Sequence, residues 1–409
     1  MKIIDSSVVL FGEFGCGNLG NEASLDAVLN WLRERPDVSV GSITREPQVV
    51  TRDHGIASVS MFTDRSRLRW VPGRARKVVQ KLTDPITIAS RLRAGQLVVV
   101  PGTGVFEQAM SGPPWGLPLS LFGLALAVRA KRARLALVGV GASYDTRRSV
   151  RLLTRSVVAL SSFVSVRDEY SRSAFVAVGA DASQMTVFPD VAFSLLDTVS
   201  AEMTSEQGKR AEDRLRIGLG VISYHDPDDH DGGQQISRAY EATVIDFCGW
   251  LVEQGHHVEL LVGDASDAPI AERVAAAVAD RSGGGVGFVG YPDHPSLLSM
   301  IETLDVVVGS RYHNLIFGLM TGTAVMSVGY ADKCERLLAA AGLETYALRV
   351  QSATTNDLQR VFTELLADLP EATRRARRYR AVAAAGAAEH RDLFLSRCLH
   401  PRRISAVTR

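Results

Sequence analysis

Short apolar runs alternate with amphipathic segments along most of this chain, and the alternation begins twice. Apolar runs of strand length with helical segments between them are typical of β-α units that build a parallel sheet buried on both faces. In the first half we expect strands at Val8–Phe11, Val38–Ile43, Leu97–Val100, Leu135–Val140 and Phe163–Val166. In the second half we expect them at Ile217–Ser223, Val258–Val262, Gly287–Val289, Asp305–Gly309 and Ala324–Val328.

The second start of the pattern divides the 409 residues into two doubly wound, Rossmann-like α/β domains. The predicted ranges are an N-terminal domain at 1–196, a polar linker at 197–216, a C-terminal domain at 217–355 and C-terminal helices at 356–409. We expect these helices to break before Pro370 and to pack back on the first domain. Facing sheets of this kind bind ligands at the carboxyl ends of their strands, so the active site is expected in the cleft between the domains.

Bulk composition excludes several classes of protein. The net charge of +1 gives no overall field that attracts nucleic acid or a membrane. The four cysteines lie far apart, which excludes a disulfide scaffold and a cysteine metal site and fits a reducing cytoplasm. The segment 226–231 is rich in His and Asp, but its residues are too closely spaced for a preformed metal site. These spacings predict a protein without a bound metal. The most apolar expected helix, Trp115–Ala130, is shorter than the roughly 20 residues that span a bilayer, so we expect the protein to be soluble and cytoplasmic.

The first expected strand runs into a glycine-rich turn, GEFGCGNLGNE, at residues 12–22. Its four glycines allow a ligand to approach the backbone, and the next helix offers free N–H groups to an anion. Asn18 and Glu22 are the polar side chains expected to face that ligand. The alternative is a plain tight turn with Asn21 as helix N-cap. The glycine-rich turn does not match a dinucleotide-binding fingerprint, because no acidic residue stands at the end of the second expected strand, Val38–Ile43.

Two further strand ends of the first half carry candidate binding residues. Gly102, Thr103 and Gly104 follow one strand and form either a ligand-binding turn or a plain turn. Arg167 follows another strand, where its guanidinium suits a carboxylate or a phosphate. The alternative for Arg167 is an ion pair with Asp168 that orients the loop. Asp190 also follows a strand, and we expect it to be structural.

The sharpest signal is Ser310-Arg311-Tyr312-His313, after the expected strand Asp305–Gly309. Ser310 is expected to cap a helix at Leu315–Met320, which places Arg311 and His313 at the positive end of that helix. Two cationic groups there are unfavourable unless an anion completes the site, although a purely structural His313 is the alternative. Tyr330 and Lys333 follow the next strand and are expected in the same basic pocket.

Taken together, these loops resemble the polysaccharide pyruvyl transferase family. The family motifs occur in order as GEFGCGNLGNE, PGTGVFEQ, VRDE, PDVAF, SRYH and YADK. Asn21 stands where the family usually has Asp, and Pro101 and Thr103 interrupt the usual run of glycines. The serine and arginine of SRYH are adjacent, so only Arg311 and His313 carry over directly.

The resemblance implies a GT-B-like fold and transfer of pyruvate from phosphoenolpyruvate onto two sugar hydroxyls, with a cyclic ketal and phosphate as products and no cofactor. Arg167, Arg311 and Lys333 would hold the donor, together with Ser310, Tyr330, Asn18 and the Gly102–Gly104 turn. His313 would act as general acid or as a phosphate ligand, with Tyr312 as a spacer. Glu22, Asp168 or Glu169 would accept the hydroxyl protons.

The basic run RSRLRWVPGRARKVVQK at 65–81 holds no acidic residue. It is either a solvated face or a contact with an anionic, lipid-linked acceptor or the inner membrane leaflet, with Trp70 at the interface. Two rival functions remain. One is a nucleotide-sugar glycosyltransferase, although Tyr330–Gly342 holds no convincing ribose-binding acidic motif. The other is a non-catalytic binding protein of the same fold, which the presence of both Arg311 and His313 disfavours.

Overall fold

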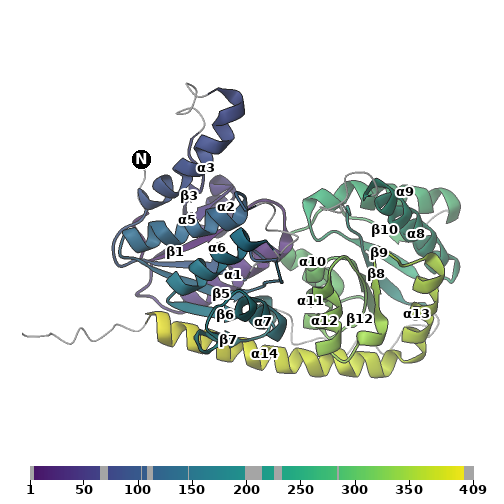
Figure 1. Ribbon diagram of the computed structural model, residues 1–409. Helices are drawn as coiled ribbons and strands as arrows, with labels where there is room; N and C mark the ends of the chain where they lie inside the picture. The colour runs from purple at the N-terminus through teal and green to yellow at the C-terminus, as the bar shows by residue number, and fades with distance from the viewer. Residues whose placement is uncertain are drawn as a thin grey trace, which may run out of the picture. The chain divides into compact units, whose positions relative to one another are not determined.

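The computed structural model describes residues 4–64, 72–102, 104–107, 114–145, 147–198, 214–224, 233–282 and 285–399. Two compact α/β units make up the chain (Figure 1). Unit 1 comprises Met1–Cys16, Asn21–Ser194 and Ala385–Arg409, and unit 2 comprises Gly17–Gly20 and Leu195–Ala384. Thr103, residues 65–71 of the basic run, 199–213 of the expected linker and the segment 226–231 lie outside the described residues.

Unit 1 contains a seven-stranded parallel sheet with the order β3-β2-β1-β4-β5-β6-β7. The five strands expected in this half are present. From β1 the strands β2 and β3 are added toward one edge of the sheet, and β4 to β7 are added on the other side of β1 toward the opposite edge. The edge strands β3 and β7 were not expected. The residues of β3 are mostly small and polar, and β7 is only three residues long, so neither forms an apolar run. The strands are β1 (Val8–Gly12), β2 (Val40–Thr44), β3 (Ala57–Ser60), β4 (Leu97–Pro101), β5 (Arg134–Val140), β6 (Phe163–Val166) and β7 (Met185–Val187).

Helices cover both faces of this sheet (Figure 1). On one face, buried side chains of α3, α5, α6 and α7 pack against alternate residues of the central strands, such as Val98 and Leu137. The α-helices of unit 1 are α1 (Leu19–Arg33), α2 (Pro47–His54), α3 (Gly73–Ala89), α5 (Leu117–Ala130), α6 (Arg148–Leu160) and α7 (Glu169–Ala177). Two 3-10 helices, η2 (Ala182–Gln184) and η3 (Val191–Thr198), precede and follow β7.

Unit 2 contains a six-stranded parallel sheet with the order β10-β9-β8-β11-β12-β13. Its central strands are buried along their length, as the uninterrupted apolar runs predicted. The strands are β8 (Arg216–Gly220), β9 (His257–Leu261), β10 (Val286–Gly287), β11 (Val306–Gly309), β12 (Ala324–Gly329) and β13 (Ala347–Arg349). The helices are α8 (Gly233–Glu253), η4 (Ala265–Asp267), α9 (Ala268–Ser282), α10 (His294–Ile301), α11 (Tyr312–Thr321), α12 (Asp332–Ala340), η5 (Glu344–Tyr346) and α13 (Thr355–Ala367).

The last helix, α14 (Leu369–Leu399), begins one residue before Pro370, so the expected break between α13 and α14 is confirmed. Proline fits this position because the first helical residues have no intrahelical acceptor for their N–H groups. The residues of α14 up to Ala384 belong to unit 2, and those from Ala385 belong to unit 1. None of the described helices is long and apolar enough to cross a membrane.

Within unit 1, α14 is anchored by the fully buried imidazole of His390. Its Nε2 atom lies 2.6 Å from the hydroxyl of Ser165 on β6, and its ring stacks on Phe188 with centroids 4.4 Å apart. Ser165 also accepts a hydrogen bond from the Gly139 N–H, at a point where the register of β5 against β6 shifts. His390 thus provides a hydrogen-bond partner for the Ser165 hydroxyl, which lies inside the core where the pairing of β5 and β6 is irregular.

We expect His390 to make the stability of unit 1 depend on pH. Burial lowers the pKa of His390 from 6.5 to about 3, so the folded chain excludes a proton that the unfolded chain binds. The contribution is fully present above pH 6.5 and is lost as the pH falls from there toward 3. The slope from this residue is about 1.4 kcal/mol per pH unit. Urea unfolding between these pH values should show it for the wild type, and His390→Gln should remove it; equal slopes would contradict the assignment.

Candidate active site

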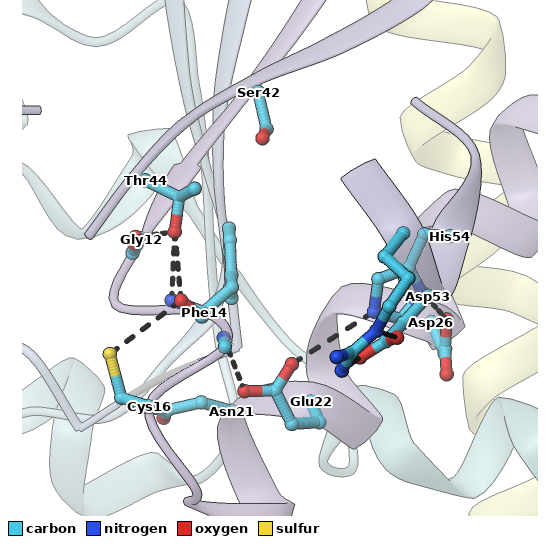
Figure 2. Close-up of polar contacts among 12 residues, drawn as sticks. Gly12, Phe14, Cys16, Asn21, Glu22, Asp26, Ser42, Thr44, Asp53 and His54 are labelled. Carbon is cyan, nitrogen blue, oxygen red and sulfur yellow. Dashed lines mark hydrogen bonds and ion pairs between the residues drawn. The ribbon is translucent and has the colours of Figure 1, made fainter. Parts of the chain in front are cut away.

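The loop between β1 and α1 is held by the side chain of Thr44 at the end of β2 (Figure 2). The Thr44 hydroxyl accepts a hydrogen bond from the Phe14 N–H at 3.1 Å and lies 3.0 Å from the Gly12 carbonyl oxygen. Gly15 then adopts a φ of +75°, a backbone conformation that side chains with a Cβ disfavour. This turn aims the Gly15 N–H at the first turn of α1.

Asn18, and not Asn21, caps α1. The helix begins at Leu19, and the Asn18 Oδ1 atom accepts a hydrogen bond from the Gly20 N–H at 3.1 Å. The alternative in which Asn21 caps the helix is therefore wrong, because Asn21 already lies within the helix and donates to the Glu13 carbonyl oxygen. The Asn18 amide also donates to Asp264 at 2.8 Å. A candidate ligand-facing residue thus has a structural task within unit 2.

Glu22 lies in the first turn of α1, with a different neighbour at each carboxylate oxygen (Figure 2). Its Oε1 atom accepts a hydrogen bond from the Gly15 N–H at 2.7 Å. Its Oε2 atom lies 4.0 Å from Nε2 of His54, whose Nδ1 atom lies 2.9 Å from Oδ1 of Asp26. His54, the last residue of α2, thus contacts two carboxylates of the first half of α1, those of Glu22 and Asp26.

Burial raises the pKa of Glu22 to about 7, against the opposing effects of the Gly15 N–H and of His54. Burial alone would lower the pKa of His54, but the hydrogen bond to Asp26 and the nearby carboxylates outweigh it and raise that pKa. A carboxyl that titrates near neutral pH is suited to accept and release protons. No sequence signal pointed to His54, because a single histidine at the end of a short helix matches no motif.

Cys16 is the thiol of the same loop, and its Sγ atom contacts the Phe14 carbonyl oxygen at 3.5 Å (Figure 2). Burial, together with the carboxylates of Glu13, Glu22 and Glu46, raises the pKa of Cys16 to about 11, against the opposing charge of Arg45. The thiol is therefore protonated at neutral pH and is a poor nucleophile. Of Cys16 and Glu22, only Glu22 has a pKa near neutral pH.

Arg167, at the end of β6, is buried among three carboxylates of unit 1. Its side chain is 2% exposed. It forms an ion pair with Glu107, and it lies 3.6 Å from Asp190 and 3.9 Å from Asp168. These carboxylates already neutralise the charge of Arg167. Binding of a donor phosphate by Arg167 stays a prediction, and it would take place beside them.

The second glycine turn makes room for this cluster. A Cβ atom at Gly104 would lie 2.8 Å from the Glu107 carboxylate, and one at Gly141 would lie 2.8 Å from the Arg167 guanidinium. A Cβ atom at Gly102 would overlap Val191. These glycines have packing reasons of their own, and donor binding by Gly102 and Gly104 stays a prediction.

Of the three candidate bases, two have other tasks. Asp168 is the N-cap of α7 and accepts a hydrogen bond from the Ser171 N–H at 2.6 Å. Glu169 is 70% exposed and lies 3.3 Å from Arg172 on the helix surface. The Glu22 side chain, by contrast, is only 16% exposed, and burial raises its pKa to about 7. The structure therefore favours Glu22.

In unit 2, Arg311 holds the N-cap position of α11 and makes a bidentate ion pair with Asp267. The Nε and Nη2 atoms of Arg311 donate to the carboxylate at 2.7 and 2.8 Å, which leaves Nη1 outside this pair. Asp267 is fully buried and also accepts from the Ser223 N–H at 2.8 Å. Burial opposes the charge of Arg311, but Asp267 outweighs it and raises the pKa of the guanidinium.

Ser310 precedes this N-cap and does not cap the helix, so the expected capping role is wrong. Its hydroxyl is buried and lies 2.8 Å from the hydroxyl of Tyr240 on α8. The observed α11 begins at Tyr312, three residues before the expected start at Leu315. The motif residues Tyr312 and His313 therefore belong to the helix itself.

His313 lies in the first turn of α11, against the backbone of Gly20. A Cβ atom at Gly20 would overlap the imidazole ring, so the last glycine of the GEFGCGNLGNE turn is what admits His313. Next to it, Asn314 is fully buried, and its amide fills the space beside Gly220 and Gly263 at the ends of β8 and β9. The first loop and the Ser310–His313 motif, far apart in sequence, therefore meet within unit 2.

Lys333, in the first turn of α12, is buried between two aromatic rings. Its Nζ atom lies 4.8 Å from the ring centroid of Tyr330 and 5.5 Å from that of Tyr312. Such cation–π contacts stabilise an ammonium group away from water. Tyr312 is therefore no spacer, and the expected grouping of Tyr330 and Lys333 is seen. The predicted sharing of one site by residues of both units stays a prediction.

Solved structures first define the class of fold. The chain is similar to UDP-GlcNAc 2-epimerase from Neisseria meningitidis bound to UDP-GlcNAc, with a TM-score of 0.61, 12% identity and coverage of 98% of this chain and 100% of that one. It is also similar to a putative UDP-N-acetylglucosamine 2-epimerase from Listeria monocytogenes (TM-score 0.64, 12% identity, 97% and 96% covered). A glycosyltransferase from Rickettsia africae is similar as well (TM-score 0.57, 11% identity, 97% and 100% covered). These similarities confirm a GT-B-like α/β fold of two Rossmann-like units.

The sequence profile described as polysaccharide pyruvyl transferase matches residues 18–332, well over half of the chain. The chain belongs to the polysaccharide pyruvyl transferase family, so the predicted resemblance is confirmed and the protein is a transferase. A search of curated proteins gave no match. Among the residues that the structure describes, no group of three His, Cys, Asp or Glu side chains could hold a metal ion.

We expect Arg167 to be needed for the stability of unit 1. Arg167→Met would leave the carboxylates of Glu107 and Asp190 buried without a cation, which costs about 3–5 kcal/mol in comparable buried pairs. Burial raises the pKa of Asp190, so protonation should make the loss smaller at pH 5 than at pH 7. Urea unfolding measures both.

The matched control is Arg172→Met, which removes a surface ion pair with Glu169 and should change the free energy of unfolding by less than about 1 kcal/mol. Equal effects of the two substitutions would show that the Arg167 cluster is not a buried charge network.

Proposed function

We propose that this transferase moves pyruvate from phosphoenolpyruvate onto two hydroxyls of a carbohydrate, forming a cyclic ketal and releasing phosphate. The observation that carries the proposal is the set of Arg311, His313 and Lys333 at the starts of two helices of unit 2. Basic groups gathered at helix starts suit an anionic ligand, which also gains from the positive end of the helix dipole. Phosphoenolpyruvate supplies two anions, a carboxylate and a phosphate.

The proposed donor site uses Lys333 and the Arg311 Nη1 atom as cations, with Tyr330 and Tyr312 shaping the pocket around Lys333. Asp267 fixes the plane of the Arg311 guanidinium, so its remaining N–H groups have a set direction. A guanidinium that is already fixed in place loses little conformational entropy when it binds a ligand. Ser310 and Asn18 then act by holding neighbouring groups, through Tyr240 and Asp264.

The reaction balances with one acid and one base. His313 protonates the methylene carbon of the enol phosphate, and the carbon that bears the phosphate becomes electrophilic. A first sugar hydroxyl adds there, the C–O bond to phosphate breaks, and a second hydroxyl closes the ketal ring. One hydroxyl proton replaces the proton given to the methylene carbon, and the other leaves with phosphate. No redox cofactor is needed.

Glu22 is the proposed base for the hydroxyl protons. It follows Gly20 by two residues on α1, and Gly20 packs against His313. One Glu22 oxygen is fixed by the Gly15 N–H, and the other faces His54. A base whose pKa is near the working pH both takes up and returns a proton readily.

The rival activity is glycosyl transfer from a nucleotide sugar, since UDP is part of similar structures. Their identity of 11–12% shows the fold alone. The family match, together with Arg311 and His313 at the start of α11 and Lys333 in the first turn of α12, favours phosphoenolpyruvate.

We expect phosphoenolpyruvate to raise the melting temperature of the protein and UDP-sugars to leave it unchanged. With a panel of glycosides as acceptors, phosphate release should depend on both substrates. His313→Ala should reduce kcat by about 100-fold or more and keep the stabilisation by phosphoenolpyruvate. The control is His257→Ala, on the exposed start of β9.

Stabilisation by UDP-sugars alone would overturn the proposed donor. Unchanged turnover in His313→Ala would remove the acid role and leave His313 as a packing residue against Gly20.

The pH profile tests the base. Glu22 must be ionised to accept a proton, so kcat should fall as the pH drops below about 7, the pKa of Glu22. Charge on His54 lowers that pKa, so His54→Gln should move the acid limb to higher pH by about one unit. Glu22→Gln should abolish turnover and keep donor stabilisation. An unmoved acid limb in His54→Gln, or an active Glu22→Gln, would assign the base elsewhere.

A further inference from the structure

Three large apolar side chains of unit 1 are exposed within or shortly before one pair of helices. Trp115 is 68% exposed, Leu152 is 66% exposed and Tyr144 is 46% exposed. Trp115 lies just before α5, Tyr144 lies shortly before α6, and Leu152 lies in α6. Helices α5 and α6 pack together and follow the neighbouring strands β4 and β5. The three side chains therefore lie at the same end of the helix pair, next to the carboxyl ends of these strands.

Three arginines lie at the start of α6, within about one turn of Leu152 in sequence. Arg147 is the N-cap of α6, and Arg148 and Arg151 lie in its first turn, which holds no acidic residue. A helix favours acidic side chains at this end, so the arrangement opposes the helix dipole. Arg147 is paired with Asp145, and Arg151 donates to the Ala177 carbonyl oxygen, while Arg148 is exposed.

The rest of both helices continues the pattern. Neither α5 nor α6 contains an acidic residue, and Arg155 is exposed one turn after Arg151. The inner face of α6 is buried through Val150, Val157 and Val158, so the arginines and Leu152 are turned outward. The exposed carboxylate on the next helix, Glu169, is paired with Arg172. The outer face thus combines positive charge with protruding apolar side chains.

We propose that this α5–α6 face, defined by Trp115, Tyr144, Arg148, Arg151 and Leu152, docks onto an anionic lipid surface. Arginines bind lipid phosphates, and aromatic and aliphatic side chains insert at the boundary between headgroups and acyl chains. A soluble anionic polysaccharide would use the arginines alone and would leave Leu152 in water. The proposal concerns the surface and stands independently of the donor chemistry.

The position of this face gives it a use. It adjoins the carboxyl ends of the strands of unit 1, where Glu107 and Arg167 also lie. Docking there would bring the loops of this sheet edge close to a membrane, and an acceptor attached to a lipid would be held near them. The residues of this face follow the basic run at 65–81 in sequence. The membrane contact considered for that run is here proposed for residues that the structure describes.

Flotation with vesicles tests the proposal. The full chain should float with vesicles of equal parts phosphatidylcholine and phosphatidylglycerol, and not with phosphatidylcholine alone. The double variant Arg148→Glu/Leu152→Ser should weaken this binding by at least about tenfold. Each basic side chain near an anionic surface raises the membrane affinity by about five- to tenfold. The matched control is Arg378→Glu/Val382→Ser on α14, which has the same spacing and an apolar side chain that is 63% exposed.

A control variant that binds like the wild type, beside the weakened test variant, supports the proposal. Absence of flotation by the wild type, or equal binding by both variants, overturns it. The same holds if the test variant changes only the oligomeric state in light scattering or only the binding of a soluble anionic polysaccharide. A melting temperature close to that of the wild type for both variants excludes misfolding, and retained phosphoenolpyruvate turnover separates this result from the proposed function.

Discussion

A buried guanidinium needs a carboxylate close by, and both units meet this requirement at the carboxyl ends of their sheets. In unit 2, Asp267 holds Arg311 by two hydrogen bonds and also accepts the Ser223 N–H. In unit 1, Arg167 is buried among Glu107, Asp168 and Asp190. Because an unpaired charge in such a place is strongly unfavourable, these pairs fix the loops that carry the candidate site. The motif arginines therefore organise the site before any ligand binds.

Glycines act on the same loops through the space that they leave. Gly20 admits the His313 ring, and Gly104 and Gly141 admit the Glu107–Arg167 pair. In each case a side chain packs where a Cβ atom would otherwise be. Gly15 has another role, since its positive φ directs an N–H to Glu22. The glycine-rich appearance of the sequence thus reflects close packing of buried side chains as well as the direction of backbone N–H groups.

The proposed chemistry depends on how burial separates otherwise similar carboxyl groups. Asp168 caps a helix and Glu169 is in water, while Glu22 is half enclosed beside His54 and titrates near neutral pH. His390 shows the same effect in the opposite direction, because a fully buried imidazole is held neutral. Position in the fold, and not residue type, decides which group can carry a proton at the working pH.

The sequence by itself determined the two parallel sheets, the family and the motif residues Arg311 and His313, because buried strands and glycine turns leave local patterns. It also determined the helix break before Pro370. Only the tertiary structure decided that Asn18 caps α1, that Ser310 bonds Tyr240, and that Asp267 holds Arg311. It alone brought His54 to Glu22 and placed Gly17–Gly20 in unit 2. These pairings join residues far apart in the chain, and no local pattern records which distant side chain will fill a given space.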